Sequence, residues 1–399
     1  ENSSDMTFTN NEIMVLGDEI LYCSGASNST FTGNLLTGSG RGIYANNAQG
    51  STVTDNLITT DNGTAAVEMD YCHDCLFDNN TILNRPNDGF RVRYSNNATF
   101  TNNTLEVYQY GFNCNDGSYY TFDNNTINDF DEQGIYFGGS ENCTVTNNYI
   151  YDNETGGYKI GIHNTSGGAN AVVSGNYVNL YNANSYDDHI YGIHVYYSEI
   201  TNNEVYINQN NYLRNRGYGI YCNYSTIQDN YVYVRDDSDN SGHLSYGITN
   251  NGENSDNLSL TENNTVIADY ETRGFEGNYA VVRNNIFKGI DEETGTTVNH
   301  EWAIMGGNYN EIYDNTMIGF RDGIHIDGDW DVTIEDNYIE SRYWGIYANN
   351  AHGNLVIKNN TLDKYTTEGD WLIYVTNTDS VVVMGNDMRA DGGSGIYVS

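Results

Sequence analysis

Residues able to carry out acid–base chemistry gather in one part of the sequence. His163 and His194 each stand two positions after a glycine that is followed by Ile, so we expect them to be neighbours on consecutive rungs of the repeat described below, about 5 Å apart. Asp187 and Asp188 lie between them in the sequence. A histidine can remove the proton next to a uronate carboxyl group. A pair of carboxylates roughly 5–10 Å apart can instead cleave a glycosidic bond, and Asp187 or Asp188 with Glu292 or Glu293 would be that pair. His163, His194, Asp187 and Asp188 are therefore the candidate catalytic residues of a polysaccharide-cleaving site.

Tyrosines, a histidine and arginines near these residues suit a saccharide. Sugars stack on aromatic rings and form fixed hydrogen bonds with polar groups. The candidate carbohydrate-binding residues are Tyr181, Tyr186, His189, Tyr212, Arg214, Arg216 and Tyr221. Ladders of like side chains also stabilise a sheet without any ligand, so a purely structural role is the alternative.

A repeated unit must position these residues. Each unit has an Asn followed two positions later by an apolar residue, and these asparagines are Asn11, Asn34, Asn56, Asn80, Asn103, Asn125, Asn148, Asn176, Asn203, Asn230, Asn264, Asn285, Asn315, Asn337, Asn360 and Asn386. Most units are 21 to 28 residues long. A fixed period in this range indicates a solenoid.

The pattern inside each unit predicts strands. Apolar residues alternate with polar ones, as in Val332-Thr333-Ile334-Glu335, and no stretch sustains a helical period. We predict an all-β fold, a parallel β-helix of about 16 rungs with an internal Asn ladder. The ladder Asn is expected at a corner, in the left-handed conformation that Asn tolerates. The apolar slot three positions before the Asn fails only at Asn264, which we interpret as a one-residue insertion displacing Leu260.

The regular repeat predicts one continuous domain over residues 1–399. Longer corner loops are expected around 149–160, 177–191, 204–218, 231–246 and 286–302. All five fall at the same corner of the repeat. Insertions confined to one face of a solenoid usually mark its working face. The candidate site is therefore placed on this long-loop face.

Composition limits the partners. The chain has 16 basic and 54 acidic residues, with a formal net charge of −38. Nucleic-acid binding is not expected, because phosphate contacts need clustered Lys and Arg. No apolar run is long enough for a membrane span. The charge favours an extracellular or cell-surface location in a saline setting. No cofactor is expected, and Ca²⁺ is the one candidate ion, since it could neutralise a uronate carboxylate.

Sequons and cysteines suggest covalent modification. Glycosylation candidates, each in an N-x-[ST] sequon, are Asn28, Asn62, Asn79, Asn97, Asn102, Asn124, Asn142, Asn153, Asn164, Asn223, Asn257, Asn263 and Asn359. Of six cysteines, Cys72 and Cys75 are the disulfide candidate, because they lie across one turn. The other four are expected to be small buried hydrophobic residues. No metal site is assigned.

The two ends of the sequence fit each other as parts of one rung. Joined tail to head they read GIYVS-ENSSDMTFTNNEI, close to the internal GIYFGGSENCTVTNNYI. Either the sequence is a segment of a longer solenoid or copies associate head to tail into filaments, driven by uncapped strand edges.

With NNTI- and NNTL-type rungs (79–82, 102–105, 124–127 and 359–362) and recurrent Gly-Ile pairs, the chain resembles the right-handed parallel β-helix superfamily of pectin-lyase-like proteins. It looks most like the carbohydrate-binding and sugar-hydrolase repeat proteins, which are abundant among archaeal adhesin-like surface proteins. The resemblance implies the fold and no particular activity. No catalytic motif of the family is present to carry over.

Two classes of function follow. The first is a secreted or cell-surface structural or adhesive protein that contacts a polysaccharide or glycan surface. The second is a polysaccharide lyase or glycoside hydrolase acting at the long-loop face of rungs 7–12. The first is favoured, because the rungs are regular and no family catalytic motif is found.

Overall fold

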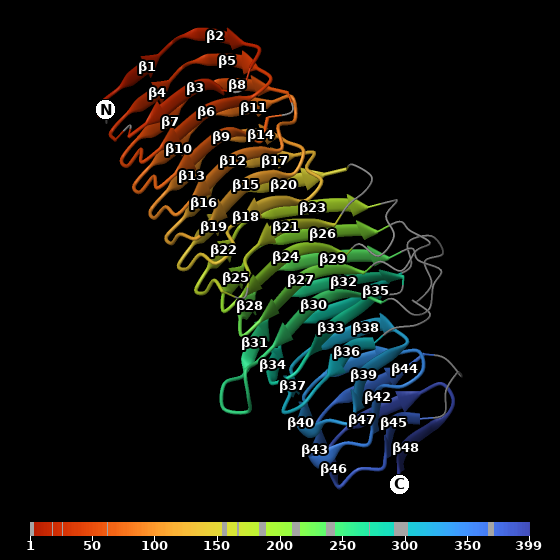
Figure 1. Ribbon diagram of the computed structural model, residues 1–399. Helices are drawn as coiled ribbons and strands as arrows, with labels where there is room; N and C mark the ends of the chain where they lie inside the picture. Colours follow the sequence, from red (N-terminus) through yellow and green to blue (C-terminus); the bar gives the residue numbers. More distant parts are fainter. Residues whose placement is uncertain are drawn as a thin grey trace. The chain divides into compact units, whose positions relative to one another are not determined.

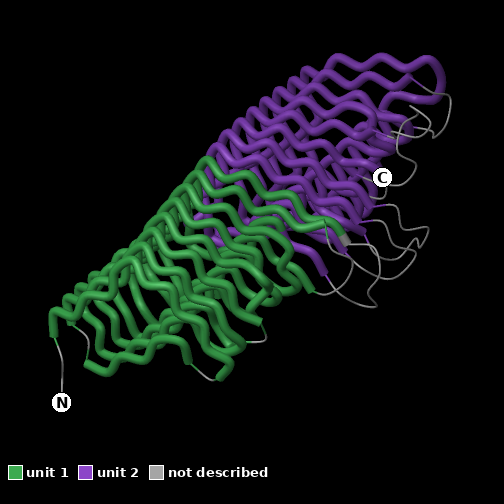
Figure 2. The backbone as a smooth tube through the Cα atoms, turned by 90° about the horizontal axis from the view of Figure 1, so that it is seen from above, with its two compact units in different colours: residues 1–182, 192–199 green, residues 183–191, 200–399 purple. Residues whose placement is uncertain are grey.

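The computed structural model describes residues 4–17, 19–25, 27–61, 63–153, 158–165, 167–182, 189–209, 216–236, 244–270, 272–290, 302–365 and 371–399. Within these residues the chain forms strands β1 to β48 and no helix (Figure 1). The strands divide between two compact units, coloured separately in Figure 2. Unit 1 contains residues 1–182 and 192–199, and unit 2 contains residues 183–191 and 200–399.

Unit 1 is built from eight turns, each contributing one strand to each of three parallel sheets. Sheet A contains β1 Thr7–Thr9, β4 Thr30–Thr32, β7 Thr52–Thr54, β10 Leu76–Asp78, β13 Thr99–Thr101, β16 Thr121–Asp123, β19 Thr144–Thr146 and β22 Val172–Ser174. Sheet B contains β2 Glu12–Val15, β5 Leu35–Gly38, β8 Leu57–Thr60, β11 Thr81–Leu83, β14 Thr104–Glu106, β17 Thr126–Asn128, β20 Tyr149–Asp152 and β23 Tyr177–Asn182. Sheet C contains β3 Glu19–Ser24, β6 Arg41–Asn46, β9 Ala65–Asp70, β12 Asp88–Arg93, β15 Tyr110–Asn115, β18 Gln133–Tyr136, β21 Lys159–His163 and β24 Ile190–Tyr196, whose first two residues belong to unit 2.

Unit 2 repeats this plan with eight further turns. Its sheet A strands are β25 Glu199–Thr201, whose first residue belongs to unit 1, β28 Thr226–Gln228, β31 Ser259–Glu262, β34 Ala280–Arg283, β37 Glu311–Tyr313, β40 Trp330–Glu335, β43 His352–Lys358 and β46 Ser380–Met384. Its sheet B strands are β26 Glu204–Gln209, β29 Tyr231–Asp236, β32 Thr265–Tyr270, β35 Ile286–Ile290, β38 Thr316–Phe320, β41 Tyr338–Ser341, β44 Thr361–Lys364 and β47 Asp387–Ala390. Its sheet C strands are β27 Gly217–Asn223, β30 Ser245–Asn251, β33 Thr272–Gly277, β36 Trp302–Gly306, β39 Asp322–Asp327, β42 Ile346–Asn349, β45 Trp371–Thr376 and β48 Ser394–Val398. The predicted parallel β-helix of about 16 rungs is confirmed, and the prediction of one continuous domain stays a prediction.

The Asn ladder is also confirmed and lies inside each unit. Asn103 is typical: its backbone N–H and its side-chain amide both donate to Oδ1 of Asn125, at 3.0 and 2.9 Å. The same amide donates to the backbone carbonyl of Phe77 at 3.0 Å. Each ladder Asn thus satisfies buried backbone groups at a corner that the sheets leave unpaired.

The left-handed residue at this corner is the one before the ladder Asn, which corrects the prediction. Asn102, Asn124 and Asn359 have φ of 54–56°, while the ladder asparagines Asn103 and Asn125 do not appear among the positive-φ residues. Two tasks fall at this corner, since one residue must turn the chain and one must point its buried amide inward, and a single Asn cannot do both. The pair of asparagines therefore divides them.

The interpretation of the Asn264 repeat as an insertion is wrong. Thr261 pairs with Ile227 in register and is fully buried, while Leu260 pairs with Thr226 and is partly exposed. The Thr261 hydroxyl accepts a hydrogen bond from the buried amide of Asn250 at 3.2 Å. A polar partner inside the turn explains why this slot holds Thr instead of an apolar residue.

The predicted long-loop ranges begin as strands. Strands β20, β23, β26, β29 and β35 occupy the first four to six residues of the five ranges. In β23, β26 and β29 sheet B extends to six residues, against three or four in most earlier turns. The loops are therefore shorter than predicted, and the central residues of these ranges lie outside the described part of the chain. No helix that could cross a membrane occurs among the described residues.

Candidate functional site

The candidate site residues predicted from sequence fall into three groups. Tyr186, Asp187, Asp188, Tyr212 and Arg214 lie outside the described residues. His163, His194 and Tyr181 belong to unit 1, and Tyr181 is in β23, away from the histidine strands. His189, Arg216 and Tyr221 belong to unit 2.

His163 and His194 stack on the outer face of sheet C in unit 1. Their ring centroids are 4.9 Å apart with an interplanar angle of 21°, which confirms the predicted spacing of about 5 Å. The ring of Tyr136 lies 5.2 Å from that of His163. His163 Nδ1 is 2.9 Å from Oε1 of Gln133, and His194 Nε2 is 3.0 Å from the Tyr196 hydroxyl.

Burial lowers the pKa of both histidines. The pKa of His163 falls to about 4. That of His194 falls to about 3, through burial and then the neighbouring His163 ring. Both rings are therefore neutral at neutral pH, as a general base must be before it takes a proton.

We predict that this pair makes unit 1 sensitive to acid. A folded pKa below the unfolded value of about 6.5 gives stability that is complete above pH 6.5 and lost as pH falls toward 4 and 3. At pH 4.5 each histidine should lower the free energy of unfolding by about 2 kcal/mol relative to pH 7. Urea unfolding of the wild type and of a His163→Gln, His194→Gln double variant at both pH values measures this loss. If both proteins lose the same stability, the assignment to the histidines is wrong.

A network of ion pairs covers the earlier turns of the same face. Glu68, with 3% of its surface exposed, lies 2.8 Å from Nε of Arg41 and 2.8 Å from Nη2 of Arg93. Arg91 contacts Asp88 at 2.7 Å and Glu68 at 4.0 Å. Burial raises the pKa of Asp88 to about 6. Since each guanidinium group faces one or more carboxylates, this network offers no excess positive charge to an anionic ligand.

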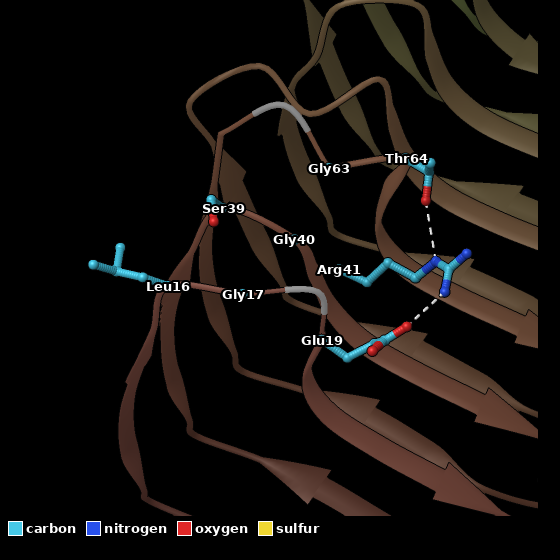
Figure 3. A pocket seen from close by; sticks show the side chains of 8 residues that line it. All are labelled: Leu16, Gly17, Glu19, Ser39, Gly40, Arg41, Gly63 and Thr64. Carbon is cyan, nitrogen blue, oxygen red and sulfur yellow. Dashed lines mark hydrogen bonds and ion pairs between the residues drawn. The ribbon is translucent and has the colours of Figure 1, made fainter.

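A hollow of about 500 Å³ opens beside this network (Figure 3). It is lined by Leu16, Gly17, Glu19, Ser39, Gly40, Arg41, Gly63 and Thr64. Figure 3 shows the guanidinium group of Arg41 between the side chains of Glu19 and Thr64, donating to Glu19 at 2.8 Å and to the Thr64 hydroxyl at 3.0 Å. The charged groups that line this hollow, Arg41 and Glu19, pair with each other. The hollow therefore offers few unpaired charged groups to a ligand.

A continuous stack of side chains covers the outer face of sheet C in unit 2. We call it the aromatic stack, and its members in order are Tyr191, Tyr218, Tyr246, Arg273, Trp302, His325, Tyr347, Tyr374 and Tyr397. Neighbouring ring centroids lie 4.0 to 5.5 Å apart. The Arg273 guanidinium carbon lies 5.4 Å from the centre of the Tyr246 ring and 4.1 Å from that of Trp302. Since ring faces inside the stack cover each other, a ligand on this surface meets ring edges and phenolic hydroxyls.

Two further tryptophans flank the C-terminal part of the aromatic stack. The Trp344 ring lies 4.6 Å from Tyr347, and the Trp371 ring lies 5.2 Å from Tyr397. Both tryptophans are partly exposed. Three of the four tryptophans of the chain therefore lie on one face, together with the partly exposed Glu276, which pairs with Arg273 at 2.9 Å.

Asp322 holds two of these tryptophans in place. Its carboxylate is fully buried and accepts hydrogen bonds from Nε1 of Trp302 at 3.0 Å and from the backbone N–H of Trp344 at 3.2 Å. Burial raises its pKa to about 6. A buried carboxylate has a large desolvation cost, so its place among the rings is more consistent with positioning the tryptophans than with stabilising the sheet.

We predict that Asp322→Ala lowers the stability of unit 2 by about 2 kcal/mol, because two buried donors lose their acceptor. Asp322→Asn keeps the volume and one acceptor and should cost about half as much. Thermal unfolding and the emission maximum of tryptophan fluorescence measure both effects. Equal melting temperatures for the wild type and the Ala variant would contradict the positioning role.

The residues predicted from sequence include only neighbours of Tyr218, near the N-terminal end of the aromatic stack. His189 lies 6.0 Å from the Tyr218 ring, and Tyr221 meets the same ring edge-on at 5.3 Å. A hydrogen bond from Arg216 to Tyr218 raises the pKa of Arg216. Seven of the missed residues stand directly before the small or apolar residue of a Gly-Ile-type pair: Tyr191, Tyr218, Tyr246, Arg273, Trp302, Trp344 and Trp371. The other four directly follow the Ile of such a pair: His325, Tyr347, Tyr374 and Tyr397.

The predicted covalent features are partly corrected. Asn28, Asn79, Asn97, Asn102, Asn124, Asn153, Asn257, Asn263 and Asn359 are exposed, and Asn142 and Asn223 are partly so. Asn62 lies outside the described residues. Asn164 is fully buried, so the prediction that it accepts a glycan is wrong.

All six cysteines are buried thiols. The predicted disulfide between Cys72 and Cys75 is not formed in the structure. Cys72 Sγ donates to the carbonyl of Asp70 at 3.4 Å, and Cys75 Sγ donates to that of Ala48 at 3.1 Å. The four other cysteines are buried as predicted.

Two protein-family models match separate parts of the sequence. A family model described as "Periplasmic copper-binding protein (NosD)" matches residues 4–190, and one described as "Right handed beta helix region" matches residues 275–399. No curated protein matches the sequence.

Several solved structures are similar. The A-module of the mannuronan C-5 epimerase AlgE6 from Azotobacter vinelandii is 11% identical over 99% of this chain and 91% of its own, with a TM-score of 0.26. PfbA, a surface adhesin of Streptococcus pneumoniae, is 12% identical over 90% and 85%, with a TM-score of 0.29. The catalytic domain of a GH87 α-1,3-glucanase is 12% identical over 98% and 64%, with a TM-score of 0.27. At these values no activity is carried over from these proteins.

Proposed function

Because the chain belongs to the right-handed parallel β-helix superfamily, whose fold alone fixes no activity, we propose a function from its surface: the protein binds a polysaccharide. The binding surface is the outer face of sheet C in unit 2. The observation that carries the proposal is the aromatic stack with its flanking tryptophans, Trp344 and Trp371.

The composition of this face supports a ligand over a purely structural ladder. A ladder that only stabilised the sheet would need rings of one kind, as in the stacked phenylalanines Phe77, Phe100 and Phe122 of the unit 1 core. The outer face instead mixes tryptophans with charged groups, among them Arg273 and the buried Asp322. The flanking tryptophans, Trp344 and Trp371, are partly exposed, and partly exposed rings beside fixed polar groups suit a bound sugar.

The charge of the protein favours an uncharged polymer. The formal net charge is −38, and the one arginine within the stack, Arg273, already pairs with Glu276. Arg321, whose guanidinium carbon lies 5.9 Å from the centre of the Trp344 ring, offsets only part of the repulsion that a polyuronate would meet from this net charge. We therefore propose a neutral polysaccharide as the ligand. The description "periplasmic" of the matching family supports a location outside the cytoplasm, and we propose an extracellular or cell-surface role.

The same family description names copper, so the fit of this chain to copper matters. Among the described residues, no three His, Cys, Asp or Glu side chains come together in a way that could hold a metal ion. The soft donors Cys72 and Cys75 donate their hydrogens to backbone carbonyls. The described residues do not fit a copper centre of three or more ligands, and we assign no copper chemistry to them.

Affinity electrophoresis in gels containing neutral polysaccharides tests the proposal. We expect slower migration in at least one of a set of β-glucan, α-glucan, mannan and xylan gels, and unchanged migration in polygalacturonate or alginate. Retardation by the polyuronates alone would overturn the proposal. The alternative of a lyase or glycoside hydrolase stays a prediction, since its carboxylates Asp187 and Asp188 lie outside the described residues; release of reducing ends from a retarding polymer would support it.

A further inference from the structure

A hollow of about 460 Å³ lies in unit 2, lined by residues outside the aromatic stack. Its lining consists of Tyr279, Asn308, Tyr309, Gly328 and Trp330. Trp330, the fourth tryptophan of the chain, is 47% exposed. The volume falls within the range of ordinary small-ligand sites.

One wall of this hollow is the end of a short stack of tyrosines. The rings of Tyr279 and Tyr309 are nearly parallel, with centroids 5.4 Å apart at 13°. Both residues have a left-handed backbone, with φ of 52° and 55°, which is costly for a bulky side chain. The backbone N–H of Tyr279 donates to the carbonyl of Asn308, and that of Tyr309 donates to the carbonyl of Trp330. The residue that follows Trp330 therefore holds the same position one turn later.

That next residue is Asp331, which does not continue the stack. Its φ is 47°, and its Oδ1 accepts hydrogen bonds from the backbone N–H and side-chain amide of Asn354, at 2.8 and 3.0 Å. The carboxylate is thus held toward the following turn. Among the described residues, Tyr279 is the one aromatic ring that stacks on Tyr309, so the far face of the Tyr309 ring has no stacked ring from this part of the chain, in contrast to the rings within the aromatic stack.

Trp330 forms the side of the hollow. Its backbone N–H donates to Oδ1 of Asn308 at 3.0 Å, which anchors the residue, and its ring lies 5.2 Å from that of His352. Gly328 lies opposite with φ of 76°, and a side chain placed there would meet nothing within 4 Å. The floor of the hollow is therefore open, with an uncovered tyrosine face, an exposed indole and a side-chain amide in reach of one ligand.

We propose that this hollow binds a single uncharged hexose ring, stacked on Tyr309 and flanked by Trp330. An aromatic face with an adjacent indole binds the apolar face of a pyranose, while Asn308 and the backbone at Gly328 can bond to its hydroxyls. The carboxylates of Asp327 and Asp329 on either side of Gly328 disfavour a uronate. The saccharide class rests on the proposed function, but the site is separate from the aromatic stack.

Saturation-transfer difference NMR tests this site on the full chain. The probes are maltose, cellobiose, laminaribiose and mannobiose, with glucuronate as the charged comparison. We expect saturation of the ring protons of at least one neutral disaccharide and weaker saturation of glucuronate. Trp330→Ala should weaken binding of that disaccharide at least about tenfold, and Trp330→Phe, which keeps a ring, should weaken it less.

Tyr94→Ala in unit 1 is the matched control. Tyr94 also has a left-handed backbone, with φ of 55°, and ends a stacked tyrosine pair at 5.2 Å, but it does not line the hollow. This variant should bind as the wild type does. Equal affinities of the wild type, Trp330→Ala and Tyr309→Ala, with unchanged melting temperatures, would overturn the proposal, as would absence of saturation transfer with every neutral disaccharide.

The outcome is distinguishable from failure of the proposed function. Trp344→Ala should reduce retardation by a polysaccharide gel and leave disaccharide saturation unchanged. If every aromatic-stack variant is still retarded by the gel, the proposed polymer surface is refuted, while the proposal for the hollow stands. Gel retardation without any disaccharide signal would refute the hollow alone.

Discussion

Asn103→Ala is expected to lower the stability of unit 1 by roughly 3–5 kcal/mol. Asn103 is only 1% exposed. Its Oδ1 accepts hydrogen bonds from the backbone N–H and from the side-chain amide of Asn80, both at 3.0 Å. Its own amide donates to the carbonyl of Phe77. Alanine removes the acceptor of the Asn80 backbone N–H, one of two acceptors of the Asn80 amide, which still donates to the carbonyl of Val53 at 2.8 Å, and a donor to the carbonyl of Phe77. A buried polar group that loses its partner carries most of its desolvation cost.

Urea unfolding together with amide hydrogen exchange measures this loss, because a repeat protein can unfold locally around one turn. Thr104→Ala is the control: the side chain is exposed in the adjacent strand β14, and its loss should change stability by less than about 0.5 kcal/mol. An Asn103→Ala variant that exchanges and unfolds like Thr104→Ala would contradict the structural role of the ladder.

The Trp302→Ala, Trp344→Ala double variant is expected to weaken polysaccharide binding by about 100-fold. Truncating one well-packed aromatic anchor commonly costs 1–2 kcal/mol or more, and 2.8 kcal/mol in total corresponds to two orders of magnitude in affinity. Both residues lie on the outer face of sheet C in unit 2, and Asp322 accepts hydrogen bonds from the Trp302 indole and from the Trp344 backbone N–H. Retardation coefficients in a series of gels with increasing polymer concentration give the affinity directly.

Tyr22→Ala separates loss of a specific surface from loss of any exposed aromatic ring. Tyr22 is 61% exposed in unit 1, and its ring centroid lies 5.3 Å from that of Tyr44, with the two rings tilted at 47°. Its removal should leave retardation unchanged. If Tyr22→Ala weakens binding as much as the double tryptophan variant, the binding surface has been placed on the wrong unit.

The fold could be predicted from sequence because its determinants are local and repeated. The ladder Asn and the apolar residue two positions later recur in every turn, so a misread turn is corrected by its neighbours. The errors arose where one residue type serves two purposes. In the pair Asn102-Asn103 the sequence does not say which Asn turns the chain and which points inward, and at Thr261 a polar side chain fills an apolar slot because Asn250 bonds to it.

The candidate site was harder to predict, because it depends on registration between distant turns. The pairing of His163 with His194 followed from their equal distance to a Gly-Ile pair, and the structure confirms it. The aromatic stack was missed because its members change from Tyr to Arg to Trp along the stack, so no single residue type repeats. Four of the five loop ranges drew attention to residues 149–246, whereas Trp302 and Trp371 are the first residues of β36 and β45 and Trp344 lies two positions before β42.

Hydroxyl-radical footprinting with the retarding polysaccharide bound is the most direct test of where the polymer lies. It reports the accessibility of individual aromatic side chains. The account predicts that oxidation of Trp302, Trp344 and Tyr347 slows severalfold on binding, while oxidation of Tyr22 and Tyr119 in unit 1 does not change. Protection of the unit 1 tyrosines with no change at the two tryptophans would contradict the assignment of the binding surface to sheet C of unit 2.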